Sequence, residues 1–201
     1  MALKIAAWNV NSILARLPTA LKVFEEVNAD IWCLQEIKCE DPRFPRLEFE
    51  AMGFNIETHG QKSYNGVAIL SKHRIEETIR GVPGLDHEHA RYIESVIAAP
   101  DGPVRVASIY APNGNPITTE KFQFKLAFME SLRSHLADLL TLEERFIIAG
   151  DYNVIAREGY MFGRRDGIVL GGSFERGEWS LTPDPDVVAG IIDGHKSIFG
   201  A

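Results

Sequence analysis

The sequence predicts an α/β domain in which mixed β-sheets are covered on the outside by helices. Three observations lead to this prediction. Short apolar runs of strand length alternate with stretches whose apolar residues recur at helical spacing. Some consecutive strands are joined by short turns, which indicates hairpins, and others by helices, which indicates crossovers. The chain of 201 residues is also long enough to bury a substantial core.

The N-terminal part of the chain predicts two strands, over residues 3–8 and 30–34, with a helix between them. Pro18 lies near the first turn of this helix, where proline is tolerated, and the helix extends to about Asn28. Its apolar stripe consists of Leu21, Phe24 and Val27. The elements expected next are a short helix over 45–52 and strands over 54–58 and 67–70.

The middle of the chain predicts a hairpin followed by a long helix. Strands over 91–98 and 104–110 are separated by the turn residues Pro100-Asp101-Gly102-Pro103. Thr119 can cap a helix that runs to about Leu140. The residues expected on its buried side are Phe122, Leu126, Met129, Leu132 and Leu136.

The apolar run from Phe146 to Ala149 predicts a buried strand that ends in polar residues. Gly150 allows a close backbone turn, and Asp151 and Asn153 follow at once. Open α/β sheets bind ligands just beyond the carboxyl ends of their strands. Carboxylate and amide oxygens suit Mg²⁺ or Mn²⁺ better than zinc. The alternative interpretation is a strand followed by an Asx turn.

Three other predicted strands also end in polar side chains. Asn9 and Asn11 follow the first strand, Glu36 follows the second, and Tyr110 ends the strand over 104–110. Taken alone, Glu36 could be a solvated charge, Asn9 a turn cap and Tyr110 a core aromatic residue. Together with Asp151, they predict a shared floor where the strand ends converge.

The overall charge and the cysteines limit the class of protein. The formal net charge of −7 argues against a nucleic-acid binder held mainly by a basic surface, but allows an enzyme that meets phosphates locally through a metal. No run approaches the length of a membrane span, and the start shows no secretory signal. With only Cys33 and Cys39 present, we expect a protein of the reducing cytoplasm.

The polar strand ends and their neighbours resemble the exonuclease III family of abasic-site endonucleases, within the endonuclease/exonuclease/phosphatase superfamily. Their order and spacing both agree with the family over residues 3–155. The matching stretches are Trp8-Asn9-Val10-Asn11, Leu34-Gln35-Glu36-Ile37-Lys38, Gly60-Gln61-Lys62, Tyr64-Asn65-Gly66-Val67, Arg91, Tyr110-Ala111-Pro112-Asn113-Gly114, Lys121-Phe122 and Gly150-Asp151-Tyr152-Asn153.

This resemblance implies a four-layered sandwich of two face-to-face sheets with helices outside. It implies a site for Mg²⁺, with Mn²⁺ as an alternative, in which Glu36 is the main ligand. The remaining residues of the implied metal site are Asn9, Asp151 and Asn153. The implied catalytic residues are Asp151, which positions or deprotonates water, Asn153, which holds the scissile phosphate, and Tyr110, which hydrogen-bonds it. The implied DNA contacts are Lys38, Lys62, Asn65 and Arg91.

The implied activity is hydrolysis of phosphodiesters 5′ to abasic sites and removal of nucleotides from 3′ ends of duplex DNA, by a monomer. Two alternatives stay open. One is a superfamily phosphodiesterase that acts on RNA, a nucleotide or a lipid headgroup. The other is a catalytically inactive remnant, because the family's C-terminal Asp and Ser-Asp-His motifs are missing from this sequence.

The chain changes character after residue 155. Residues 156–201 hold 9 of the 17 glycines and show no long periodic pattern, so we predict no element there. His195 lies in a split Asp193-Gly194-His195 sequence, and Arg165 to Leu170 resembles the family's other motif only faintly. We therefore expect a family-like catalytic part over 1–155 and a divergent tail over 156–201. A truncated or frameshifted reading frame, or a natural variant with a different lid, would produce such a tail.

Overall fold

The computed structural model describes residues 3–153, 173–175 and 178–180. The chain divides into two compact units, residues 1–154 and 155–201. The elements of the first unit are β1 (Ile5–Asn9), α1 (Leu17–Val27), β2 (Ile31–Gln35), a 3-10 turn (Asp41–Arg43), α2 (Arg46–Ala51), β3 (Asn55–His59), β4 (Val67–Ser71), β5 (Ile75–Arg80), β6 (Tyr92–Ile97), β7 (Val104–Tyr110), α3 (Glu120–Leu140) and β8 (Phe146–Asp151).

The strands of the first unit form two mixed four-stranded sheets. Their strand orders are β1-β2-β4-β3 and β5-β6-β7-β8. In each sheet one edge pair is parallel, β1 with β2 and β7 with β8, and the other pairs are antiparallel. Helices α1 and α3 make the two crossovers that parallel pairing requires.

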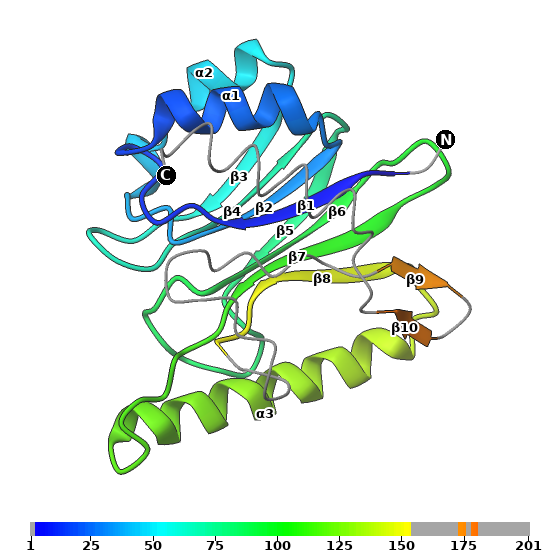
Figure 1. The fold of residues 1–201 in the computed structure, drawn as a ribbon. Helices are drawn as coiled ribbons and strands as arrows, with labels where there is room; N and C mark the ends of the chain where they lie inside the picture. Colours follow the sequence, from blue (N-terminus) through cyan, green and yellow to red (C-terminus); the bar gives the residue numbers. More distant parts are fainter. Residues whose placement is uncertain (1–2, 154–172, 176–177, 181–201) are drawn as a thin grey trace. The chain divides into compact units, whose positions relative to one another are not determined.

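The layers of the first unit confirm the predicted four-layered sandwich (Figure 1). Helices α1 and α2 cover the outer face of the first sheet, and α3 covers the outer face of the second. Between the two sheets lies an apolar cluster to which both contribute. Its fully buried members include Ile31, Cys33, Ile69, Ile93 and Val106.

The sequence of β2 explains its central place. Because side chains alternate along a strand, Ile31 and Cys33 point between the sheets while Trp32 and Leu34 point toward α1. All five residues of β2 are buried, so both of its faces are covered. Under α1, the ring of Phe24 stacks on Trp32 with centroids 4.0 Å apart and an interplanar angle of 9°.

Three details of the first unit differ from the prediction. The strand predicted as buried over Phe146 to Ala149 is the edge strand β8, in which no residue is fully buried and Ile147 is 38% exposed. Strand β5 was not expected, because as a partly exposed edge strand it shows no clean alternation of apolar and polar residues. The stripe predicted on α3 was wrong at Leu126, which is 49% exposed. Leu126 lies six residues before buried Leu132, which places it about 120° away around the helix, whereas Phe128 lies almost above Leu132 and is buried.

In the second unit, β9 (Ser173–Glu175) and β10 (Glu178–Ser180) pair antiparallel. Strands of three residues are shorter than any periodic pattern can reveal, so no element was predicted there. His195 and the stretch from Arg165 to Leu170 lie outside the described residues. Within the described part of the chain, no helix is both long and apolar enough to cross a membrane.

Candidate active site

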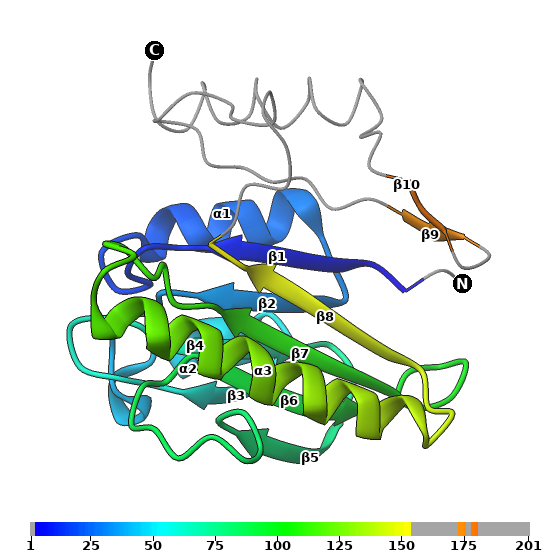
Figure 2. The same ribbon diagram turned by 90° about the horizontal axis from the view of Figure 1, so that it is seen from below.

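The carboxyl ends of four strands meet at one end of the sandwich. Parallel pairing places Asn9 opposite Gln35 at the ends of β1 and β2, and Tyr110 opposite Asp151 at the ends of β7 and β8. Strands β1 and β8 lie side by side, one from each sheet (Figure 2). A Cβ atom at Gly150 would lie 2.1 Å from the carbonyl oxygen of Ile109, so only glycine lets β8 approach β7 this closely before Asp151.

The side chain of Asn9 joins the two sheets at this point. Its Nδ2 donates hydrogen bonds of 2.9 Å to Glu36 Oε1 and of 2.9 Å to Asp151 Oδ2. Because both oxygens bond the same nitrogen, they lie at most about 6 Å apart. Two full negative charges at that separation repel each other by about 3 kcal/mol at an effective dielectric constant of 20. The site therefore favours a cation.

Glu36 is held ionised by its neighbours. Burial alone would raise its pKa, but hydrogen bonds from Lys38, Asn9 and Tyr110 outweigh burial and hold the pKa below its usual value. Lys38 Nζ lies 2.8 Å from Glu36 Oε2 and also donates to the side chain of Asn11. Glu36 and Lys38 both have left-handed backbone angles, with φ of 52° and 51°. Such conformations are costly for non-glycine residues and concentrate at functional sites.

Tyr110 and Arg91 form a second wall of the site. Burial and the neighbouring Glu36 carboxylate raise the pKa of Tyr110 to about 12, so its hydroxyl remains a hydrogen-bond donor at neutral pH. The guanidinium of Arg91 lies 4.8 Å from the centroid of the Tyr110 ring, and its Nη1 donates to the Tyr110 carbonyl oxygen at 3.3 Å. Burial lowers the pKa of Arg91, while Tyr110 and Glu36 oppose that shift. Arg91 thus brings a partly desolvated positive charge to the site.

Asp151 and Asn153 form the Asx turn that was the alternative interpretation, and the turn is part of the site. The backbone N–H of Asn153 donates to Asp151 Oδ1 at 2.9 Å, and Asn153 Nδ2 donates to the Ala111 carbonyl oxygen at 2.8 Å. Lys125 of α3 donates from Nζ to the Asn153 carbonyl oxygen at 2.8 Å. Helical spacing alone does not indicate this contact, because it does not show what lies opposite the Lys125 side chain.

The loop between β3 and β4 forms the rim. Asn65 is buried, and its Nδ2 donates to Gln61 Oε1 at 2.9 Å, so it shapes the wall of the site. Gln61 Oε1 also accepts from the backbone N–H of Ala90 at 3.1 Å. Gln61 was not among the predicted site residues, although it stands in the matched stretch before Lys62. Lys62 lies exposed on the same loop and not on the floor of the site.

The residues present fit a magnesium ion. Mg²⁺ commonly takes one or two protein carboxylates and completes its shell with water and phosphate oxygens. Glu36 and Asp151 supply two carboxylates. The Asn9 nitrogen between them is a hydrogen-bond donor, so Asn9 would hold a metal through Oδ1, which here accepts from the Asn11 backbone N–H at 3.2 Å. The described residues contain no group of three His, Cys, Asp or Glu side chains arranged for a metal. This donor set suits Mg²⁺ or Mn²⁺ rather than zinc.

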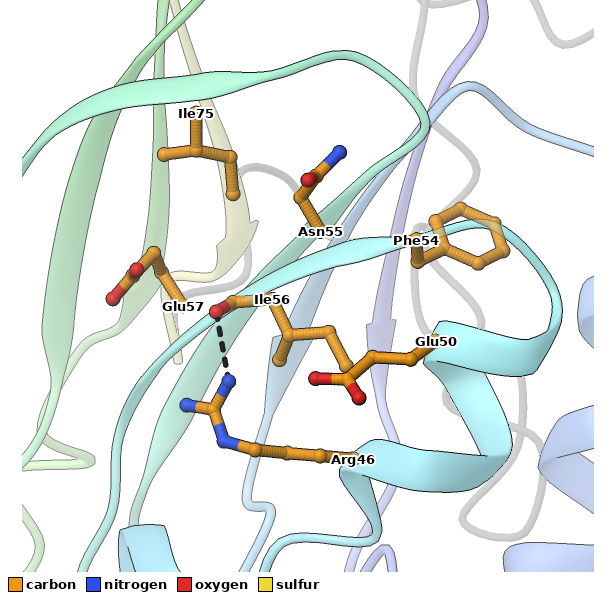
Figure 3. A pocket seen from close by; sticks show the side chains of 7 residues that line it. All are labelled: Arg46, Glu50, Phe54, Asn55, Ile56, Glu57 and Ile75. Atoms are coloured by element: carbon orange, nitrogen blue, oxygen red, sulfur yellow. Dashed lines mark hydrogen bonds between the residues drawn. The ribbon is translucent and has the colours of Figure 1, made fainter.

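A hollow of about 330 Å³ lies at the opposite end of the first sheet, beside α2 (Figure 3). It includes Asn55, which pairs with Ser71 at the far end of β4 from the site. The Arg46 guanidinium is already engaged there, because Nη1 donates to the Ile56 carbonyl oxygen at 3.0 Å. None of the predicted site residues lines this hollow, so its size does not mark the functional site.

The Endonuclease/Exonuclease/phosphatase family matches residues 6–193 of the sequence. The chain belongs to that family. This match extends beyond residue 155, where the resemblance read from the motifs ends. Exodeoxyribonuclease III of Haemophilus influenzae is 32% identical over 155 residues, which cover 76% of this chain and 58% of the relative. An exodeoxyribonuclease of Bacillus subtilis is 28% identical over 160 residues, which cover 78% of this chain and 60% of the relative.

Solved structures of family members have the same fold. The 3′-5′ exonuclease from Neisseria meningitidis superposes with a TM-score of 0.70 at 34% identity, over 75% of this chain and 58% of that chain. An AP endonuclease from Archaeoglobus fulgidus superposes with a TM-score of 0.71 at 35% identity, over 76% of this chain and 58% of that chain. The chain thus spans less than two thirds of the length of the relatives that it matches.

Proposed function

We propose that this protein is a divalent-metal-dependent DNA repair nuclease. It hydrolyses phosphodiesters on the 5′ side of abasic sites and removes nucleotides from the 3′ ends of duplex DNA. One observation carries the proposal: the amide of Asn9 bonds a carboxylate from each sheet, Glu36 and Asp151, in one place. The names of its relatives support DNA as the substrate, and one Neisseria relative, a 3′ phosphatase, is described as bound to a product DNA hairpin.

In the proposed reaction, Glu36, Asp151 and the Oδ1 atom of Asn9 would hold Mg²⁺ or Mn²⁺, with Asn153 beside them. When bound, the metal neutralises charge on the phosphoryl group and assists the leaving oxygen. Asp151 orients or deprotonates the attacking water. Its carboxylate is fixed by the Asn9 amide and the Asn153 backbone N–H, and each oxygen has a second lone pair for water.

The remaining residues act on the phosphate and the strand. The protonated hydroxyl of Tyr110 and the side chain of Asn153 hydrogen-bond the scissile phosphate. Arg91 adds positive charge next to Tyr110, which stabilises the charge that develops on the phosphoryl oxygens. Lys38 and Lys62 contact the DNA backbone, and Asn65 keeps the loop in position by its bond to Gln61.

We further propose that the active protein is a cytoplasmic monomer, and that residues 1–155 contain the catalytic part while 156–201 form a divergent tail of the same domain. Circular dichroism and light scattering on the full chain and on residues 1–155 test this boundary. A folded, monomeric 1–155 fragment is expected. A fragment that unfolds or associates would show that the tail completes the fold.

The test is cleavage of a duplex with one abasic site, with Mg²⁺ and with a chelator. Metal-dependent incision on the 5′ side of the abasic site is expected. It should fall by at least about 100-fold in Asp151→Ala, because a positioned base contributes about 10²–10⁴ to the rate. Asp138→Ala, on the exposed side of α3, is the matched control and should cut like the unaltered protein.

A substrate panel separates the proposal from its alternatives. Cutting of RNA, nucleotides or lipid phosphodiesters in preference to DNA would identify a different phosphodiesterase. Folded protein that cuts no substrate would show that the family fold is present without its chemistry. Activity that persists in the chelator, or in Asp151→Ala, would refute the assigned site.

A further inference from the structure

Four aromatic rings gather at the rim of the candidate site from three separate segments. Tyr64 belongs to the loop between β3 and β4, His87 and His89 to the loop between β5 and β6, and Phe124 to α3. The centroid of the His87 ring lies 4.2 Å from that of His89 and 4.0 Å from that of Phe124. The centroids of the Tyr64 and His89 rings lie 6.3 Å apart. The mechanism proposed above gives these rings no role.

The ring cluster of Tyr64, His87, His89 and Phe124 adjoins the residues that meet the phosphate. His89 stands two residues before Arg91, so the Cα atoms of the two residues are at most about 7 Å apart, even in an extended chain. Two segments that carry the rings are joined near this point, because the Gly66 N–H donates to the Ala90 carbonyl oxygen at 2.9 Å. The rings are therefore within reach of the nucleotides next to the scissile phosphate.

Exposure and charge indicate what could rest on this cluster. Tyr64 is 53% exposed and His87 is also exposed, so part of the ring surface faces solvent. Burial lowers the pKa of His89, and His87 and Arg91 add to that shift while Glu88 opposes it, which favours the neutral form of the ring. Asp86 and Glu88 are exposed on either side of His87 and would repel a phosphate. A flat, uncharged nucleobase suits this surface better than the DNA backbone does.

We propose that the cluster of Tyr64, His87, His89 and Phe124 is a stacking platform for an unpaired base next to the cleaved phosphate. This inference rests on the proposed function, because it takes DNA as the ligand, and it specifies the preferred form of that DNA. Every base has a face that can stack on an aromatic ring, so the platform tolerates any sequence. A base inside a duplex is already stacked on its neighbours. The platform therefore favours frayed or single-stranded 3′ ends.

The test measures binding in a chelator, so that cleavage plays no part. Two fluorescein-labelled duplexes carry the same two-nucleotide 3′ overhang, with bases in one and with tetrahydrofuran sugars without bases in the other. The phosphates are identical. Any affinity of the site for tetrahydrofuran as an abasic-site analogue would favour the second duplex, so a preference for the first duplex reports stacking. We expect the full chain to bind the base-bearing overhang about 5- to 100-fold more tightly, which is the range for stacking of one base on an aromatic side chain.

The variants separate stacking from other effects of substitution. His87→Ala should remove most of the preference for bases, and His87→Phe should retain it, because a flat ring is restored at an exposed position. His73→Ala, on the turn between β4 and β5, is the matched histidine control and should behave like the unaltered chain.

The outcomes also separate this inference from the proposed function. Protein that cuts abasic DNA but binds both overhangs equally would overturn the platform and leave the nuclease intact. Protein that prefers the base-bearing overhang but cuts nothing would retain the platform and remove the nuclease. An unchanged preference in His87→Ala, no binding of either DNA, or binding of a basic peptide in place of DNA would each overturn the inference.

Discussion

Replacement of Arg105 by Met would break a buried ion network between the second sheet and α3. Arg105 Nη1 donates to Glu94 Oε1 at 2.8 Å, and the Glu94 side chain is only 1% exposed. The other Glu94 oxygen accepts from the Tyr92 hydroxyl and lies 2.7 Å from His135 Nε2 on α3. On its outer side, Arg105 bonds the half-exposed carboxylate of Glu144.

The magnitude follows from the exposure of these partners. Removal of one member of a buried ion pair costs about 3–5 kcal/mol, because it leaves an uncompensated buried charge. Tyr92 and His135 still contact Glu94, so we expect a loss near the lower limit, about 3 kcal/mol. The bond to Glu144 adds less than about 1 kcal/mol, since an exposed pair is screened by water. A 3 kcal/mol loss corresponds to a melting point lower by about 6–12 °C for a chain of this size.

Urea denaturation followed by circular dichroism measures these changes. Glu144→Gln is the matched control and should lower the free energy of unfolding by less than about 1 kcal/mol. The double variant Arg105→Met with Glu94→Met should recover part of the loss, because it removes both buried charges together. If Arg105→Met is no more harmful than Glu144→Gln, the network does not stabilise the fold as argued.

Three further predictions concern packing, backbone and pH. Phe24→Ala removes the ring stacked on Trp32 and should lower the free energy of unfolding by about 3–5 kcal/mol in urea, and a change below about 1 kcal/mol would contradict this packing. Gly150→Ala places a Cβ 2.1 Å from the Ile109 carbonyl oxygen, so we expect a lower melting point and lost cleavage, and a fully active variant would refute the close approach. Burial alone would raise the pKa of Glu94, but its hydrogen-bond donors outweigh burial and lower it in the folded state. Its stabilisation is therefore complete above the unfolded pKa of about 4.3 and is lost as the pH falls through the lower folded pKa. Glu94→Gln should reduce this loss of stability in urea titrations below about pH 4.3, and an identical pH profile would contradict the assignment.

Local sequence signals were sufficient to predict most of the first unit. The apolar run from Phe146 to Ala149 forms the predicted strand, and Gly150 follows it where β7 leaves no room for a Cβ atom. Its predicted burial was wrong, because an apolar run does not show that the strand lies at the edge of its sheet. Strand β5 could not be predicted, because apolar and polar residues need not alternate regularly along an edge strand that is partly exposed to solvent. The exposure of Leu126 could not be predicted either, because α3 carries apolar residues on more than one side and their spacing does not show which side meets the sheet.

The polar residues that the structure brings together at the strand ends could be named from the sequence, but the hydrogen bonds between them could not. Polar residues at strand ends marked Glu36 and Asp151 without showing that one amide would bond both. The roles of Gln61 and Lys125 depend on backbone groups of distant loops, the N–H of Ala90 and the carbonyl of Asn153. Almost every residue carries the same backbone N–H and C=O groups, so the sequence does not show which residue supplies such a partner.

The hydrogen bonds that Asn9 makes to both sheets also have a consequence for how the protein folds during synthesis. Asn9 and Asp151 are 142 positions apart, so the hydrogen bond between them closes almost the whole of the first unit into one loop. Contacts of such long separation form only after the intervening chain has been ordered, because the entropy of closing the loop must be overcome first. A ribosome must therefore release nearly all of this unit before any active centre can exist. A nascent or partly folded chain therefore cannot assemble the candidate site.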